Sequence, residues 1–438
     1  MKLAQRAASA PPFHAMSIGA RAREIEAQGH SVSKLSLGEP SFGAPPAVRE
    51  SLARAAQQDL PYTPAAGLPQ LRREISRFYR EQHGVEVSPR RILITSGASA
   101  GLLLATALTT EPGDDVVIAD PCYPCNRQLV ASFGGRIVLA ATTAQSRYQL
   151  DLDSMEAAWT PYTNVLMLAT PSNPTGTSIP QDELDRLCRA ARARGAWRIV
   201  DEIYLGLADP DAQGRPARTV LATDPDAIVV SSFSKYFGMT GWRLGWVVLP
   251  EELVDPACNL AVNYFLCAST PAQIAALEAF TPQSLELCEQ RRLELVERRR
   301  LALAQLRQIG LEVPVEPDGA FYIYFDVSDT GRSSWDFCMQ ALEEAHVALT
   351  PGRDFGVRTA ESHVRLSYAA SREEITEGLT RLSRFLNTLP WPPASSRLAP
   401  ARPEADTAAH QGTHADSPRS TSPATVRRGL RSRSSPIR

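Results

Sequence analysis

The chain has 438 residues, of which 43% are hydrophobic and 21% charged, and its formal net charge is −2. This composition is that of an ordinary globular protein, and the length fits two domains better than one compact core. No apolar run approaches the roughly 20 residues that a membrane-spanning helix needs, so we expect no membrane partner. The first residues also lack the continuous apolar segment of a secretory signal, which favours a cytoplasmic protein.

Seven cysteines and seven histidines are scattered along the chain. An odd number of cysteines over such a length indicates free thiols in a reducing compartment rather than a disulfide framework. The histidines and cysteines show no spacing typical of metal ligands, so we predict no metal site.

The first 40 residues contain an amphipathic helix around 17–29, and we expect them to form an N-terminal arm that joins part of a smaller domain. Between about 91 and 249, short apolar runs alternate with amphipathic stretches, which is typical of a mostly parallel sheet with helices on both faces. We therefore predict an α/β fold with a large domain over 41–285. Its seven expected strands are 91–95, 114–120, 135–140, 164–170, 197–202, 226–232 and 243–249, with helices at 98–110 and 181–195.

A leucine-rich, highly charged segment over 282–310 predicts a long bridging helix. The pattern then becomes strand, helix, strand and helix, which predicts a small α+β C-terminal domain over 286–390. These four elements are expected at 320–327, 333–347, 363–370 and 372–389.

Residues 391–438 are rich in Pro, Ser, Ala and Arg and contain almost no large apolar residue. Such a segment cannot bury enough surface to offset its ordering entropy, so we predict a disordered tail. The tail contains eight arginines and only three acidic residues, which makes it basic. A solvated extension is favoured over a contact with nucleic acid, and we expect no nucleic-acid partner.

The distribution of lysine singles out one residue. Only Lys2, Lys34 and Lys235 are lysines, whereas arginine supplies the other permanent positive charges. Arginine keeps its proton because its pKa lies above about 12, while the pKa of a lysine can be lowered until its amine attacks a carbonyl. Lys235 is therefore a candidate nucleophile. A codon bias toward arginine is the alternative explanation.

The segment SSFSKYFGMTGWRLGW surrounds Lys235. Hydroxyls at Ser232 and Ser234 and the guanidinium of Arg243 are groups that hold a phosphate dianion, and the glycines allow close approach of the backbone. S-x-S-K followed by G-x-R-L-G resembles the lysine signature of the class I/II aminotransferases, which have fold type I of the pyridoxal-phosphate-dependent enzymes. The resemblance covers most of the chain, from LSLGEPSFGAPP to VRLSYA, with the motifs in the family's order.

This resemblance implies that Lys235 holds pyridoxal 5'-phosphate as a Schiff base and that Asp201 of IVDEIYLGL pairs with the pyridine nitrogen. A carboxylate there keeps the ring protonated, so the ring can act as an electron sink. Tyr204 and Asn173 of TPSNPTGT would hydrogen-bond the phenolic oxygen, and the bond between Asn173 and Pro174 resembles one that is cis. Helix capping by Asp201 and a plain turn at SNPTG are the alternatives.

Further motifs fit the same family. In TSGASAGL, the resemblance implies that the backbone of Ala98 and Ser99 holds the phosphate at a helix N-terminus, although the pattern taken alone favours an ordinary strand-to-helix turn. Tyr123 of DPCYPCN matches the aromatic residue that stacks on the ring, with a redox C-x-x-C pair as the alternative. Arg365 of VRLSYA corresponds to the arginine that clamps the α-carboxylate, and Gly38 of SLGEPSF would add an N–H.

Tyr62 of YTPAAGLPQLR resembles the tyrosine that reaches the phosphate of the neighbouring subunit, which implies a homodimer with shared active sites. A surface tyrosine is the alternative. The implied activity is transfer of an amino group from an L-amino acid to a 2-oxo acid, with Lys235 as nucleophile and then as general base and acid.

Three other functions stay open because one fold hosts many outcomes. The first is different chemistry with the same cofactor, such as that of a racemase, a C–S lyase, or an amino-acid cyclase or synthase. The second is a regulator that binds the cofactor, and the third is a structural protein without it. We assign no second arginine to a distal carboxylate, so a dedicated aspartate enzyme is not favoured.

Overall fold

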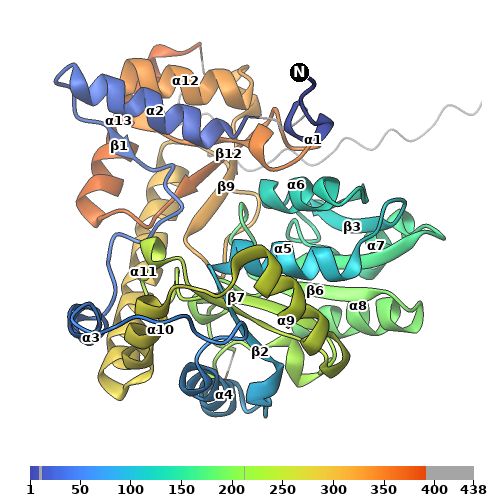
Figure 1. The fold of residues 1–438 in the computed structure, drawn as a ribbon. Coiled ribbons are helices and arrows are strands. Elements are labelled where there is room, and N and C mark those ends of the chain that lie inside the picture. The colour runs from blue at the N-terminus through green and yellow to red at the C-terminus, as the bar shows by residue number, and fades with distance from the viewer. Residues whose placement is uncertain (9–11, 212, 391–438) are drawn as a thin grey trace, which may run out of the picture. The chain divides into compact units, whose positions relative to one another are not determined.

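The structure is a computed structural model that describes residues 1–8, 12–211 and 213–390. The tail predicted over 391–438 lies outside the described residues. The fold is α/β, as predicted, and its centre is a seven-stranded sheet (Figure 1). No helix in the described ranges is both long enough and apolar enough to cross a bilayer.

The central sheet contains all seven strands expected from the apolar runs. Their order is β2-β8-β7-β6-β5-β3-β4, and only β8 runs antiparallel to its neighbours. The sheet is therefore mostly parallel, as predicted. The strands are β2 (Ile92–Thr95), β3 (Asp115–Asp120), β4 (Arg136–Ala141), β5 (Thr163–Ala169), β6 (Trp197–Asp201), β7 (Ile228–Ser232) and β8 (Gly245–Val248).

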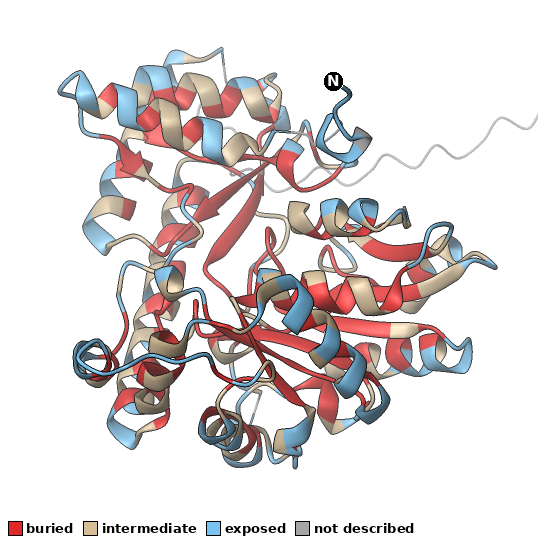
Figure 2. Ribbon diagram, viewed as in Figure 1, coloured by how far each residue is buried: buried red, intermediate tan, exposed pale blue. Residues whose placement is uncertain are grey.

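Helices cover both faces of this sheet, and Figure 2 shows the sheet as a buried layer between them. Successive residues of β5 point to opposite faces: Val165 packs with α5 and α9, whereas Leu166 packs with α4 and α8. Burial on both faces explains why these strands are continuous apolar runs rather than alternating ones. The covering helices include α4 (Pro69–His83), α5 (Ala98–Thr109), α8 (Gln181–Ala193) and α9 (Glu251–Phe265).

The sequence analysis assigned α5 and α8 but not α4 or α9. Each of these two helices begins at a proline or just after one. Proline suits the start of a helix, because a residue there needs no backbone N–H for a hydrogen bond within the helix. Other helices not assigned from the sequence are α1 (Gln5–Ala8), α3 (Pro46–Ala55), α6 (Pro124–Ser132), α7 (Leu152–Ala158) and α10 (Thr270–Ala276).

A second core surrounds a three-stranded antiparallel sheet in the order β11-β12-β9. The long predicted bridging helix is α11, and the strand and helix alternation that follows it is present. These elements are α11 (Pro282–Gln308), β9 (Tyr322–Asp326), α12 (Ser334–Ala345), β11 (Thr350–Pro351), β12 (His363–Ser367) and α13 (Arg372–Thr388).

The N-terminal arm packs into this second core. Helix α2 (His14–Ala27) lies beside α12 in Figure 1, and its Ile18 and Ile25 are buried in the same cluster as β9 and β12. Strand β1 (Ser33–Lys34) pairs in parallel with β10 (Val347–Ala348). The domain boundaries at residues 41, 286 and 391 stay predictions.

Candidate active site

A cavity of about 310 Å³ lies where the parallel strands of the large sheet end, next to β9 and β12. All of the predicted site residues except Ser232 and Tyr62 line it. They are Gly38, Ala98, Ser99, Tyr123, Asn173, Asp201, Tyr204, Ser234, Lys235, Arg243 and Arg365. Residues far apart in the sequence therefore meet in one cavity.

Lys235 follows β7 and points its amine into the cavity. Its Nζ donates a hydrogen bond to the carbonyl oxygen of Gly38 at 2.6 Å. Burial lowers the pKa of the amine to about 8, the charge of Glu39 opposes that shift, and the charges of Arg365 and Arg243 add to it. A lysine with this pKa releases its proton near neutral pH, as a nucleophile or general base must.

Asp201 ends β6 and is 6% exposed. Burial raises the pKa of its carboxyl to about 6, while the backbone N–H of Ile203 at 3.1 Å and the charge of Lys235 act in the opposite direction. The N-cap of the next short helix, Leu205–Leu207, is Tyr204. Asp201 therefore does not cap that helix, and its side chain faces the cavity.

Arg365 on β12 is a buried cation, 3% exposed. Its Nη1 donates to Oδ1 of Asn173 at 2.8 Å, and its Nη2 donates to the carbonyl oxygen of Ser36 at 2.8 Å and to the Thr350 hydroxyl at 3.2 Å. Its Nε has no partner among the described residues. All these acceptors are neutral, and no ion pair of Arg365 is recorded among the described residues, so this buried charge favours an anionic ligand.

The opposite end of the cavity combines several donors. Ala98 and Ser99 form the first turn of α5, whose N–H groups lack partners within the helix. Arg243 has a left-handed backbone with φ of 49°. A Cβ at Gly97 would lie 2.5 Å from Nη2 of Arg243, so only glycine permits this approach of the guanidinium to the helix start. Ser234 also lines the cavity.

Tyr322 is a site residue that the sequence analysis missed. Its hydroxyl lies 2.9 Å from the Tyr204 hydroxyl, and its ring centre is 4.4 Å from the Arg365 guanidinium. A Cβ at Gly38 would come within 2.9 Å of the Tyr322 hydroxyl. Tyr322 therefore lies beside three predicted site residues, which are Gly38, Tyr204 and Arg365. Other cavity residues that we did not predict are Phe13, Ala15, Met16, Ser36, Leu37, Glu39, Leu102, Ala169, Pro171, Ile203 and Thr240.

Ser232 and Tyr62 are the two predicted residues that the structure leaves outside the cavity. The hydroxyl of Ser232 donates to the carbonyl oxygen of Leu244 at 3.0 Å and accepts the N–H of Ser234. It supports the turn that holds Ser234. Tyr62 is 78% exposed on the surface of its own chain.

The C-x-x-C segment contains two free cysteines, Cys122 and Cys125. Helix α6 begins at Pro124, so the motif does open a helix. Burial raises the pKa of Cys122 to about 12, however, which keeps it as an unreactive thiol. Tyr123 lines the cavity between them, as the stacking interpretation requires.

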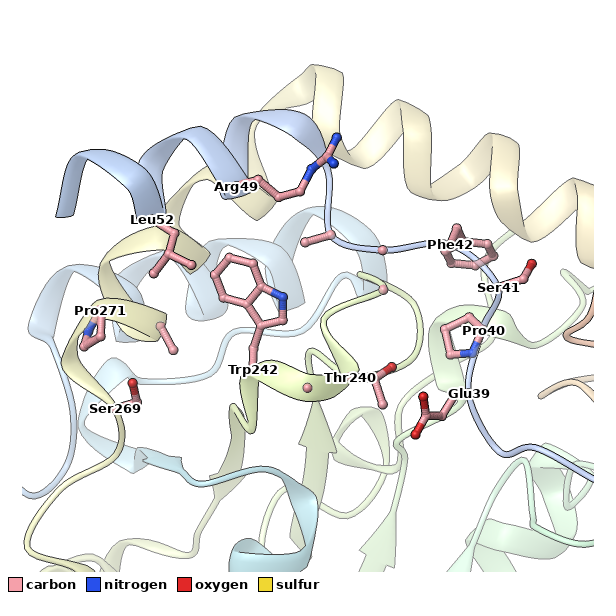
Figure 3. Close-up of a pocket in the computed structure, with 15 residues that line it drawn as sticks. Glu39, Pro40, Ser41, Phe42, Arg49, Leu52, Thr240, Trp242, Ser269 and Pro271 are labelled. Carbon is pink, nitrogen blue, oxygen red and sulfur yellow. The ribbon is translucent and has the colours of Figure 1, made fainter. Parts of the chain in front are cut away.

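A surface groove of about 630 Å³ adjoins the cavity (Figure 3). Glu39 and Thr240 line both. The remaining wall of the groove includes Phe42, Arg49 and Trp242, which are labelled in Figure 3. The cavity and this depression on the surface therefore share part of their walls.

Comparisons with known proteins define the class of protein. Residues 30–382 match the family described as aminotransferase class I and II. The chain is 38% identical over 381 residues to a valine–pyruvate aminotransferase of Mycobacterium tuberculosis, covering 86% of this chain and 97% of that protein. It is 33% identical to an aspartate/prephenate aminotransferase of Thermus thermophilus, covering 88% and 98%.

Solved structures agree with the sequence relatives. A crystal structure of an aminotransferase from Mycobacterium tuberculosis matches with a TM-score of 0.84 and 38% identity, covering 89% of this chain and 100% of that one. The aspartate aminotransferase of Thermus thermophilus with maleate matches with a TM-score of 0.82 and 32% identity, covering 88% and 100%. The chain belongs to the class I and II aminotransferase family. It is a transaminase that moves an amino group between an amino acid and a 2-oxo acid.

Proposed function

We propose that the cavity holds pyridoxal 5'-phosphate bonded to Lys235, and that Arg365 binds the α-carboxylate of the amino acid. One observation carries this proposal: a buried amine of lowered pKa and a buried guanidinium, whose Nε has no hydrogen-bond partner among the described residues, line the same cavity. The amine suits a carbonyl group, and the guanidinium suits a carboxylate.

The donors at the other end of the cavity fit the phosphate. The first N–H groups of α5, the Ser234 hydroxyl and Arg243 supply a positive dipole end, a hydroxyl and a fixed charge. Asp201 would hold a proton at the pyridine nitrogen, and Tyr123 would stack on the ring. When bound, the cofactor accepts the electron pair that remains on the substrate's α-carbon after its proton leaves.

The protein's own part in the reaction is to place the amino acid and move its α-proton. Arg365 fixes the carboxylate, and its unpartnered Nε is available for that contact. Lys235 Nζ, neutral above about pH 8, takes the α-proton and holds it for return. Tyr204 and the amide nitrogen of Asn173 would donate to the phenolic oxygen. Oδ1 of Asn173 already accepts from Arg365, which leaves that nitrogen for the cofactor.

The chain's lysine content makes the test of cofactor attachment sharp. Borohydride reduction of the purified holoenzyme should fix the cofactor to Lys235, as located by mass spectrometry of the peptides. Lys235→Ala should abolish the adduct. Lys34→Ala is the matched control, because Lys34 pairs with Glu26 at 2.8 Å outside the cavity. An adduct on Lys34, or full turnover by Lys235→Ala, would overturn the proposal.

We also propose a homodimer in which each chain completes the other's site. Apolar side chains are exposed in the loop around Tyr62 and at the end of α9. The loop contacts the start of α10, because the Thr270 hydroxyl donates to the carbonyl oxygen of Pro61 at 2.9 Å, and α10 begins five residues after α9 ends. These exposed residues are Leu60, Tyr62, Val262, Tyr264 and Leu266. Such a patch favours a protein interface. The groove in Figure 3 would give a neighbouring chain access to the cavity.

Mixing two inactive variants tests the shared site. Lys235→Ala and Tyr62→Ala chains, unfolded and refolded together, should regain about one quarter of the wild-type activity, because half of the dimers are mixed and each holds one intact site. Each variant refolded alone is the control. If Tyr62 acts in its own chain, mixing restores nothing.

We further propose a cytoplasmic location. The seven cysteines are all free, including the half-buried Cys125, Cys258 and Cys267. Free thiols of this kind persist in a reducing compartment. Fractionation of cells that produce the protein should place it with cytoplasmic markers.

A further inference from the structure

The position of the substrate's α-carbon follows from two backbone contacts. Arg365 donates to the carbonyl oxygen of Ser36 at 2.8 Å, and Lys235 donates to that of Gly38 at 2.6 Å. In the proposed function the guanidinium of Arg365 binds the α-carboxylate and the neutral amine of Lys235 takes the α-proton of one amino acid. Its α-carbon must therefore lie beside the short segment 36–38, and its side chain must pass close to Leu37.

The residues available to contact that side chain are apolar. Leu37 is 47% exposed and lines the cavity. Phe13, Ala15 and Met16 line it too, and Met16 is 64% exposed. Exposed apolar surface at a cavity becomes favourable when an apolar ligand covers it.

A buried carboxylate holds this apolar surface in place. Asp354 accepts the backbone N–H groups of His14 and Ala15, each at 2.8 Å, at the start of α2. A carboxylate at a helix N-terminus is favourable because it meets unpaired N–H groups and the positive end of the helix dipole. Asp354 therefore fixes the position of the apolar residues at the start of α2.

The charges around the same place disfavour an acidic side chain. Glu39 follows Gly38, lines the cavity and is exposed. Its carboxylate raises the pKa of Lys235 and has no ion-pair partner recorded within the described chain. Arg243 and Arg365 are the arginines of the described cavity lining, and the phosphate and the α-carboxylate would use them. A second carboxylate would meet Glu39 without a cation to neutralise it.

We propose that the amino donor has an uncharged aliphatic or thioether side chain, selected by Leu37 and Met16 and, against acidic donors, by Glu39. This inference rests on the proposed function, because it uses Arg365 and Lys235 to place the substrate. A single methylene group in an apolar pocket changes kcat/KM by roughly 10-fold to 200-fold. L-leucine and L-methionine should therefore exceed L-aspartate and L-glutamate by at least about tenfold in kcat/KM.

The first experiment compares these four donors with the holoenzyme, reading the change in cofactor absorbance in single half-reactions. Higher kcat/KM for the apolar pair supports the inference. Equal or higher kcat/KM for the acidic pair overturns it while leaving the aminotransferase proposal intact, because the absorbance change still reports amino transfer. If no donor changes the absorbance, the proposed function fails and this inference fails with it.

A charge placed on the apolar surface gives the second experiment. Met16→Arg should raise the ratio of kcat/KM for L-glutamate over L-leucine by at least about tenfold, because a cation then faces the distal carboxylate. Leu293→Arg is the matched control, since Leu293 is 51% exposed on α11 and does not line the cavity. The same ratio change in both variants, or none in Met16→Arg while cofactor absorbance is retained, would overturn the role of Met16.

Discussion

The two sides of the cavity differ in how they are built. The floor consists of Asn173, Asp201 and Lys235, each at or just after the end of a strand in the large sheet. The wall consists of Tyr322 and Arg365 on two antiparallel strands of the small sheet. The floor carries groups that can exchange a proton near neutral pH, whereas the wall carries a permanent charge held against an aromatic ring.

This difference indicates a division of labour. Floor residues suit proton transfer and cofactor binding, so changes there should lower kcat. The charge and the aromatic ring of the wall suit the placement of the substrate, so loss of either should mainly raise KM. Substitutions at Lys235, Arg365 and Tyr322 test this division, and a pH experiment on Glu202, next to Asp201, tests how burial beside the floor affects stability.

The largest effect is expected from Lys235→Ala, which removes the amine that moves the α-proton. The value of kcat should fall by about 10⁴-fold, the upper end of what a positioned general base contributes. Steady-state kinetics at saturating cofactor measure it. Lys2→Ala is the control, and a loss that appears only in KM would contradict the assignment of Lys235 to the floor.

A pH effect on stability should come from Glu202, which follows Asp201 and accepts hydrogen bonds from the Thr219 hydroxyl and the Val220 N–H. Burial raises the pKa of its carboxyl to about 7 from 4.5. The folded protein therefore binds a proton that the unfolded chain releases between these values. The stabilisation is fully present below pH 4.5 and is lost as the pH rises through 7, by roughly 3 kcal/mol.

Urea unfolding of the wild type, of Glu202→Gln and of the exposed control Glu86→Gln at pH 5 and pH 8 measures this effect. Glu202→Gln should lose most of the difference between the two pH values, because an amide does not titrate. If Glu202→Gln shows the same difference in unfolding free energy between pH 5 and pH 8 as the wild type, the burial of Glu202 does not cause the pH effect.

On the wall, Arg365→Lys should raise KM by about 10²-fold for both amino acid and oxo acid, since a lysine cannot form two parallel hydrogen bonds to a carboxylate. Binding of the cofactor, followed by its absorbance, should stay intact. Arg353→Lys, a change at an exposed arginine paired with Glu361 at 2.7 Å, is the matched control. A fall in kcat at constant KM would break the division between floor and wall.

The smallest effect is expected from Tyr322→Phe, which removes only the hydroxyl that contacts Tyr204. The loss of one hydrogen bond of about 0.5–1.5 kcal/mol should lower kcat by about tenfold or less. It should also shift the pH at which the absorbance of the bound cofactor changes. KM should hold, because the phenyl ring still packs on Arg365, whereas Tyr322→Leu should raise it. If Tyr322→Phe and Tyr322→Leu have the same KM, the aromatic ring does not help to place the substrate.

The comparison also shows which features can be predicted from sequence. Lys235, Asp201 and Asn173 were found because each belongs to a short motif whose neighbours fix its position at a strand end. Tyr322 was missed although its strand was predicted, because its contact with Arg365 depends on the register that places Ser367 opposite Tyr322. No local pattern encodes that register.

The substrate side of the cavity was also missed. Met16 and Leu37 are ordinary apolar residues, and nothing in their neighbourhood signals a cavity. Helix α2 begins at His14 rather than at 17, because its first N–H groups are satisfied by Asp354, far away in the sequence. A search for local capping residues cannot find such a partner.

The distance along the chain between Asp354 and helix α2 bears on biosynthesis. While the ribosome extends the chain, the start of α2 lacks this acceptor, and β1 lacks its pairing strand β10, until residues 347–354 have emerged. The large sheet has all seven strands well before that point. The region proposed to choose the amino donor thus acquires its final shape late, after the part that would carry the cofactor.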